Sequence, residues 1–243
     1  MFSTKPNPLT NDILPMDNQV IKSDDPLPLG NFNYIFCGKK GSGKSTLLLN
    51  LLKRKTSPYY KQFDNIFLIS PTAGRDDKFS KLVEELKEED KFYDTLNDGI
   101  IDDIVKRLND FNEEYKKDHP KKTPRNLLIM DDCIHMLPSS TEKSSVNQLF
   151  TNQRHMKLSL WICTQQLTKL NRLIRTNADL LSFFPNDNTK EFQTLADEWS
   201  IEPKFLQSVY KYATEKPNSF LHISFCGRRP IFFSKFDRII TNE

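Results

Sequence analysis

The chain has 243 residues and a mass of 28.4 kDa, and its 37% hydrophobic and 28% charged residues are typical of a globular protein rather than a disordered one. Its formal net charge of +3 is too small to indicate a nucleic-acid partner by itself. No apolar run approaches the roughly 20 residues that a membrane-spanning helix needs, and the N-terminus lacks the basic start and apolar centre of a secretory signal.

Residues 1–30 differ in composition from the rest of the chain. They hold few periodic apolar positions and contain the prolines Pro6, Pro8, Pro15, Pro26 and Pro28. Because proline interrupts helices and sheets, this composition predicts an extended, proline-rich arm outside the core. The folded nucleotide-binding domain is then expected over residues 31–243.

A glycine-rich loop follows an apolar strand that is predicted over residues 32–37. Gly38, Gly43, Lys44 and Ser45 match the phosphate-loop pattern G-x-x-x-x-G-K-[ST] without a mismatch. Glycines let successive backbone N–H groups point into one concavity at a helix N-terminus, which favours anions. We expect a nucleoside triphosphate to contact the loop residues, which are Gly38, Lys39, Lys40, Gly41, Ser42, Gly43, Lys44, Ser45 and Thr46.

Two side chains of this loop have expected chemical roles. Lys44 is expected to reach the β- and γ-phosphates, and the Ser45 hydroxyl is expected to coordinate Mg²⁺. A leucine-rich helix should run from the loop to about residue 55, because Pro58 prevents much continuation.

The middle of the chain predicts two further strands with a charged helical region between them. The segment NIFLISP reads as a strand that ends at Pro71. Apolar residues then recur at helical spacing, at Ile100, Ile101, Ile104, Val105, Leu108, Phe111 and Tyr115. After a loop over residues 119–124, NLLIMDD has the length and setting of a strand that is buried on both faces.

An acid pair ends this buried strand. Asp131 follows four apolar residues, where a Walker B aspartate holds Mg²⁺ through water. Asp132 beside it is a candidate general base for the attacking water. The alternative is a solvated turn without a catalytic role.

The segment 143–178 predicts a helix over residues 143–156 and a strand over residues 158–165. The strand ends in WICTQQ, and a polar residue at such a strand end can touch both the γ-phosphate and the lytic water. Gln165 is the candidate, with Thr164 and Gln166 as neighbours that can take the role. This segment is basic, without any acidic residue, and both phosphate binding and a solvated surface remain open readings. Its basic residues are Lys143, Arg154, Lys157, Lys169, Arg172 and Arg175.

The remainder predicts a short strand over residues 180–185, helices over 190–199 and 203–213, and a β-hairpin within 219–236. Strands separated by helices predict an α/β fold: a central, mostly parallel sheet with helices on both faces. Phosphate loop, acid pair and polar strand end occur in the order of P-loop NTPases of the additional-catalytic-acid type. In NTPases of this type the strand with the polar end lies in the sheet between the strand before the phosphate loop and the strand that ends in the acid pair. No guanine-reading N-K-x-D motif occurs, so ATP is preferred over GTP.

The four cysteines lie in or just beyond apolar runs, without the close spacing of zinc ligands. Reduced, buried thiols in a cytosolic protein are therefore expected.

Several of these motifs together resemble one family. GKKGSGKST, ISPT, LLIMDD, NQRHMKLSLWICTQQ and LSFF look like the genome-packaging ATPases of poxviruses, giant viruses and virophages, within the FtsK–HerA superfamily. The resemblance implies that Lys44 and Ser45 bind phosphate and metal, that Asp131 holds Mg²⁺ and that Asp132 is the catalytic carboxylate. It further implies that Gln165 is a sensor.

The resemblance also implies a candidate arginine finger. Arg154 matches the arginine that such enzymes insert into the site of the adjacent subunit, where it stabilises the charge of the transition state. Competing candidates are Arg172, Arg175, Arg228 and Arg229.

The function implied by the resemblance is a motor that pumps double-stranded DNA into a preformed capsid. Its expected partners are DNA bound without sequence preference, capsid or procapsid vertex proteins, and further copies in a homo-oligomeric ring. Lys157, Lys169 and Arg172 are candidate DNA contacts. The host-cell cytoplasm or a viral factory is the expected location, with retention in the virion as a further option. The alternatives are a nucleoside or nucleotide kinase and a nucleotide-binding regulatory protein without turnover.

Overall fold

The computed structural model describes residues 25–139, 141 and 143–240, so most of the predicted arm lies outside the described residues. The strands are β1 (Asn33–Cys37), β2 (Asn65–Ile69), β3 (Phe92–Tyr93), β4 (Asn126–Asp131), β5 (Leu158–Thr164), β6 (Leu180–Phe183), β7 (Leu221–Ser224), β8 (Ile231–Ser234) and β9 (Asp237–Arg238). The α-helices are α1 (Lys44–Lys53), α2 (Ser80–Glu88), α3 (Asp98–Asp118), α4 (Ser145–Asn152), α5 (Arg172–Thr176), α6 (Thr189–Glu198) and α7 (Pro203–Thr214). Three short 3₁₀ turns are η2 (Ala73–Arg75), η3 (Ile134–Met136) and η4 (Leu167–Lys169).

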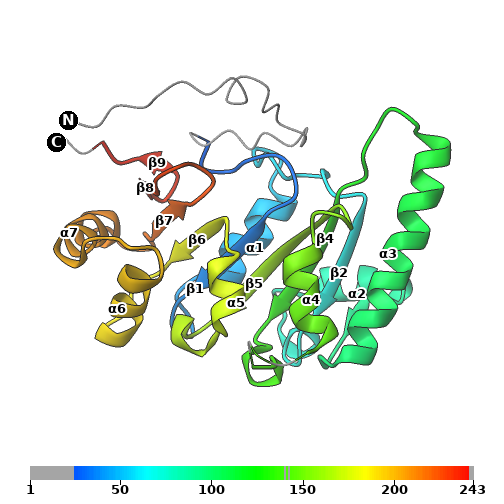
Figure 1. Cartoon of the computed structure of the whole chain (residues 1–243), viewed down its shortest axis with the longest axis horizontal. Helices are drawn as coiled ribbons and strands as arrows, with labels where there is room; N and C mark the ends of the chain where they lie inside the picture. Colours follow the sequence, from blue (N-terminus) through cyan, green and yellow to red (C-terminus); the bar gives the residue numbers. More distant parts are fainter. Residues whose placement is uncertain (1–24, 140, 142, 241–243) are drawn as a thin grey trace, which may run out of the picture.

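One sheet runs through the described part of the chain, in the order β3-β2-β4-β5-β1-β6-β7-β8-β9 (Figure 1). The strands from β3 to β6 are parallel, and β7, β8 and β9 are antiparallel to their neighbours. Strand β5 lies between β1 and β4, so the predicted position of the polar strand is confirmed. The predicted fold class is also confirmed, including the C-terminal hairpin, which is β7–β8.

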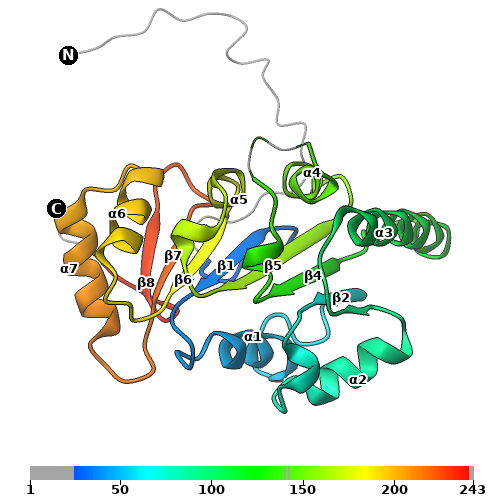
Figure 2. The same cartoon turned by 90° about the horizontal axis from the view of Figure 1, so that it is seen from below.

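Helices cover both faces of the sheet. Figure 2 shows α1 and α2 on one face and α3, α4 and α5 on the other. Along β1 the side chains alternate between the two layers: Ile35 belongs to the core under α3 and α4, whereas Tyr34 and Phe36 belong to the core under α1 and α2. This alternation explains why the predicted strands are apolar without interruption, since a parallel sheet in this setting has no solvent-facing side.

The amphipathic pattern of the charged middle region places α3 on the sheet. Ile101, Ile104 and Leu108 are fully buried, and the intervening acidic residues face outward. Asn97 precedes the helix as its N-cap, and its side chain accepts a hydrogen bond from the otherwise free Ile100 amide. No helix in the described ranges is both long and apolar enough to cross a membrane.

Residues 25–30, the described end of the predicted arm, contact the domain. Leu27 is buried, the Tyr59 hydroxyl donates to the Pro28 carbonyl at 2.9 Å, and His222 Nε2 donates to the Pro26 carbonyl at 2.7 Å. Burial lowers the pKa of His222 to about 4, so its ring is neutral near pH 7. These contacts fasten the segment across β7 and the loop after α1.

Several elements differ from the sequence expectation. β3 and β9 are two residues each and α5 is five residues, and none of them was predicted. Helix α1 ends at Lys53, shortly before the expected end, and α4 is shorter at both ends than the predicted helix. The cysteines are free thiols, three of them buried.

Candidate functional site

The phosphate loop connects β1 to α1 at the carboxyl end of the parallel strands. Gly41 and Gly43 have φ angles of +79° and +106°, which L side chains rarely adopt. Gly38 has a different reason to be glycine: an added Cβ would lie 2.5 Å from Cβ of Phe184 and 2.7 Å from Oγ of Ser42. The loop is thus packed closely against the end of β6, and its shape is set by backbone geometry that only glycine allows.

The lysine of the loop is held over it by main-chain oxygens. Lys44 Nζ donates to the carbonyls of Gly38 at 2.6 Å and Lys39 at 2.9 Å. Lys39 itself forms a salt bridge with Asp187, on the loop between β6 and α6. Ser45 is partly exposed in the first turn of α1, next to the exposed Thr46, and Lys40 at the crest of the loop is also exposed. The hydroxyl of Ser45 is therefore accessible to a metal ion bound at the loop.

Asp131 is the last residue of β4 and is buried, with 8% of its surface exposed. Burial, together with the charge of Asp132, raises its pKa to about 6, against the lowering effects of Cys163, Lys44 and Ser70. Because burial disfavours the charged form of this carboxyl group, a cation bound beside it would stabilise the carboxylate. The environment of Asp131 thus fits a residue that coordinates Mg²⁺ directly or through a water molecule.

Asp132 lies beside the polar end of the next strand. Its φ is +58°, in the left-handed region that aspartate tolerates better than most residues, and its amide donates to the Cys163 carbonyl at 3.3 Å. Gln165 Nε2 donates to its Oδ1 at 3.2 Å. The structure thus brings together two predicted site residues, which are 33 positions apart in the chain.

The neighbours of Gln165 have other contacts. Thr164 is buried, its carbonyl accepts the Gly38 amide at 3.1 Å, and its hydroxyl accepts the Gln166 amide at 3.2 Å. These bonds fix the chain direction where β5 emerges beside the phosphate loop. Of the three polar candidates, only the exposed Gln165 has its side-chain amide on the acid pair.

Two residues that sequence reasoning did not single out support this site. Glu191 of α6 is fully buried and accepts hydrogen bonds from the amides of Leu167 and Thr168 and from the Thr168 hydroxyl. It therefore fastens the loop that carries Gln165. Ser70, at the end of β2, contacts Asp131 Oδ2 at 3.5 Å; it belongs to the ISPT segment, so that resemblance was the available signal.

Arg154 is not part of this cluster. It precedes β5, whereas Gln165 follows it, and the intervening strand spans roughly 20 Å. Arg154 Nη2 lies 3.7 Å from Oδ1 of Asp179, which precedes β6 at the same amino edge of the sheet. Its side chain remains 56% exposed. The structure therefore separates Arg154 from the phosphate loop of its own subunit.

The competing arginines divide into two groups. Arg172 and Arg175 both pair with Glu198 of α6, and Arg175 is almost buried in that contact. Arg228 and Arg229 lie in the turn between β7 and β8. This turn is at the amino edge, because the Phe225 amide donates to the Asp179 carbonyl.

The phosphate loop follows β1, a buried aspartate with a second acid beside it ends β4, and a glutamine follows the intervening strand β5. This arrangement defines a P-loop NTPase fold of the additional-catalytic-acid type. Residues 23–209 match the family described as Poxvirus A32 protein. The chain belongs to this family, and the resemblance found in the sequence is confirmed.

Viral proteins are among the relatives of this chain. An uncharacterized protein of Invertebrate iridescent virus 6 is 28% identical over 79% of this chain and 70% of its own length. One of Frog virus 3 is 29% identical over 81% of this chain and 56% of its own length. One of Acanthamoeba polyphaga mimivirus is 22% identical over 63% of this chain. The chain thus spans little more than half of the latter two relatives, 56% and 52%.

Solved structures share the fold. The genome packaging NTPase B204 of Sulfolobus turreted icosahedral virus 2, in complex with AMP, aligns with a TM-score of 0.59 at 19% identity, over 86% of this chain and 98% of that one. The DNA-packaging ATPase B204 of Sulfolobus turreted icosahedral virus aligns with the same TM-score over 89% of this chain and 98% of its own. At this identity the similarity establishes the fold.

Proposed function

We propose that the protein is an ATPase whose hydrolysis drives double-stranded DNA into a preformed capsid. The observation that carries the proposal is the Asp132–Gln165 contact beside the phosphate loop. The contact supports the proposal because a carboxylate that could accept a proton from water and an amide that could orient that water lie at adjacent strand ends. Family membership supports the packaging role.

Each side chain has a role in this chemistry. Lys44 would bind the β- and γ-phosphates, and Ser45 and Asp131 would hold Mg²⁺, which neutralises charge on the phosphates. Asp132 would accept a proton from the attacking water, and Gln165 would orient that water. Asp is one methylene shorter than the Glu often found at this position. The left-handed backbone of Asp132 orients its carboxylate differently from that of a residue in an extended conformation.

ATP is the proposed nucleotide. The sequence lacks the guanine-reading motif, and the structural relative B204 has been solved in complex with ATP-gammaS and with AMPPCP. Activation of water by Asp132 and Gln165 also distinguishes the site from that of a kinase, which must exclude water. The same pair argues against a regulatory protein without turnover.

A homo-oligomeric ring is part of the proposal. Because Arg154 lies at the edge opposite its own phosphate loop, it can act on a γ-phosphate only in a neighbouring subunit. A trans contact of this kind makes each site depend on the next subunit. The remaining proposed partners are duplex DNA gripped through its phosphates and vertex proteins of the capsid or procapsid, in the host-cell cytoplasm or viral factory.

The proposal is tested with purified protein in a translocation assay. ATP-dependent displacement of a third DNA strand from a duplex is the expected result, and Lys44→Ala should abolish it. Phosphate transfer to a nucleoside, with no effect of duplex DNA, would instead identify a kinase.

A further inference from the structure

A basic groove lies away from the nucleotide site, where α1 ends and α2 passes beside the loop before β2. One hollow of about 480 Å³ is lined by Leu52, Lys53, Tyr60, Lys61, Lys81 and Glu85, among others. A second, of about 610 Å³, lies next to it, because both hollows are lined by Lys61 and Gln62. The second hollow adds Lys122 and Arg125 from the loop after α3. We name the two together the basic groove.

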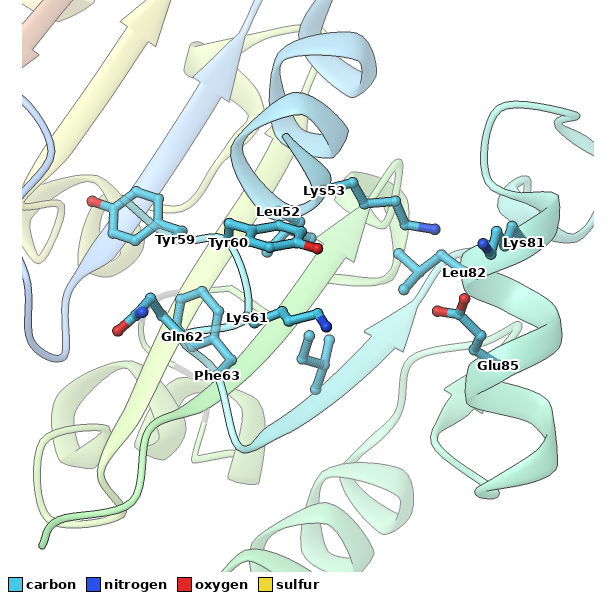
Figure 3. Close-up of a pocket in the computed structure, with 11 residues that line it drawn as sticks. Leu52, Lys53, Tyr59, Tyr60, Lys61, Gln62, Phe63, Lys81, Leu82 and Glu85 are labelled. Carbon is cyan, nitrogen blue, oxygen red and sulfur yellow. The ribbon is translucent and has the colours of Figure 1, made fainter. Parts of the chain in front are cut away.

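Three lysines line the first hollow together with apolar and aromatic side chains. Figure 3 shows Lys53 of α1 and Lys81 of α2 extending toward each other, with Lys61 reaching into the same hollow beside Tyr60. Glu85 is the acidic residue among those that line it. The floor is apolar, so the lysine stems lie along it while their ammonium groups stay at the opening.

In the described part of the chain these lysines form no salt bridge. The salt bridges there involve other cations, and none includes Lys53, Lys61, Lys81 or Lys122. In the second hollow, the one aspartate, Asp64, accepts from the main chain of the facing loop. Four lysines without a salt bridge, with Arg125, outnumber the carboxylates Glu85 and Asp64 along the groove, and this net positive charge suits a polyanion.

The groove also has a direct structural link to the nucleotide site. Helix α1 begins at Lys44 in the phosphate loop and ends at Lys53 in the groove, a length of roughly 15 Å. A displacement of this helix as the phosphates change would move Lys53 as well. A ligand in the groove would therefore contact the far end of the helix that begins at the phosphate loop.

We propose that the basic groove binds the phosphodiester backbone of duplex DNA. This inference rests on the proposed function for its choice of polyanion. The lysines contact phosphates and not base edges, so binding is independent of sequence and falls with salt concentration. The groove differs from the candidate contacts suggested by the sequence, since Lys157, Lys169 and Arg172 do not line it.

The test compares two triple variants of the full chain. Lys53→Ala, Lys61→Ala and Lys81→Ala together remove the charges of the first hollow. The matched control, Lys190→Ala, Lys204→Ala and Lys211→Ala, removes the same charge from exposed positions on α6 and α7. Binding to a fluorescent duplex is measured by anisotropy across a range of NaCl concentrations, together with ATP hydrolysis in the absence of DNA.

The expected result is specific to the groove variant. Its slope of log affinity against log salt should decrease in magnitude by up to roughly 2.7, about 0.9 for each DNA phosphate that a lysine no longer neutralises. The control should keep the wild-type slope, and both variants should keep DNA-independent hydrolysis. Replacing the same three lysines with arginine should preserve binding, because the charge is retained.

Three outcomes overturn the inference. If the groove variant binds duplex like the control while wild type hydrolyses ATP and binds DNA, the groove assignment is wrong and the proposed motor stands. A further measurement compares how far duplex DNA and polyglutamate, at equal charge, protect Lys53, Lys61 and Lys81 of the wild type from chemical acetylation. If polyglutamate protects them as well as duplex does, the groove binds an acidic protein segment instead. If wild type neither binds duplex nor hydrolyses ATP, the proposed function fails together with the groove.

Discussion

Gly38→Ala should destabilise the protein and prevent nucleotide binding. The new Cβ would lie 2.5 Å from Cβ of Phe184 and 2.7 Å from Oγ of Ser42, both closer than real Cβ contacts allow. Cβ of Phe184 cannot rotate away as the end of a flexible side chain could, so the main chain of the loop or of β6 must shift. Overpacking of this kind typically costs about 1–3 kcal/mol. For a chain of this size, a loss of about 2 kcal/mol lowers Tm by roughly 4–8 °C.

Two other glycines separate the clash from other effects. An alanine at Gly74 would make only ordinary contacts, the nearest at 3.7 Å to Phe92, so Gly74→Ala should change stability by no more than about 0.5 kcal/mol. At Gly41 an added Cβ meets nothing within 4 Å, but its φ of +79° predicts a cost of about 1–2 kcal/mol from backbone strain alone.

The assay is thermal unfolding of the three variants, combined with equilibrium binding of a fluorescent ATP analogue. Gly38→Ala should show both a lower Tm and little or no binding, whereas Gly74→Ala should match wild type in both. The reasoning is refuted if Gly38→Ala unfolds at the temperature of Gly74→Ala and still binds the analogue.

Three further predictions concern charged residues. The folded pKa of Asp131, about 6, lies above its unfolded value of 3.8, so the free energy of unfolding of the metal-free protein falls as pH rises through this window. In EDTA at pH 8, the free energy of urea unfolding of Asp131→Asn should exceed that of wild type by on the order of 3 kcal/mol. A difference between the two that does not widen from pH 4 to pH 8 contradicts the burial argument. Arg154→Ala should lower turnover by roughly 10³–10⁵, and mixing it with Lys44→Ala subunits should restore activity, so failure to do so in assembled rings counts against a trans finger. Glu191→Gln should lower kcat by up to roughly 10²-fold with little change in KM, because the loop carrying Gln165 loosens. Glu198→Gln, on the same helix but paired with arginines of α5, is the control, and an equal effect there would remove the positioning role.

The sequence predicts the central layers well because each long element has its own pattern. Strands β1, β4 and β5 are apolar runs that are buried on both faces, and α3 shows its buried positions at helical spacing. The two-residue strands β3 and β9 are too short to carry a period. β3 pairs with the free edge of β2, and β9 with that of β8, so both depend on the folded sheet and not on their local sequence.

The candidate site was predictable to the extent that its residues sit in contiguous motifs. The phosphate loop and the acid pair each occupy a few consecutive positions, and the predicted strand order came from the type of NTPase that these motifs indicate. Glu191 was missed because its contacts with Leu167 and Thr168 join elements on either side of β6. The predicted strand between Arg154 and Gln165 already indicated that the two residues lie at opposite edges of the sheet. The pairing of Arg154 with Asp179 could be seen only in the structure.

Phosphate release from ATP, measured with and without duplex DNA, is the most direct test of the account. Wild type should hydrolyse ATP faster when duplex is added. Asp132→Asn should bind ATP with unchanged affinity and hydrolyse it poorly, because its amide cannot take the proton from water. Wild-type protein that leaves ATP intact in the presence of Mg²⁺ and duplex, or an Asp132→Asn variant that turns over at the wild-type rate, would contradict it.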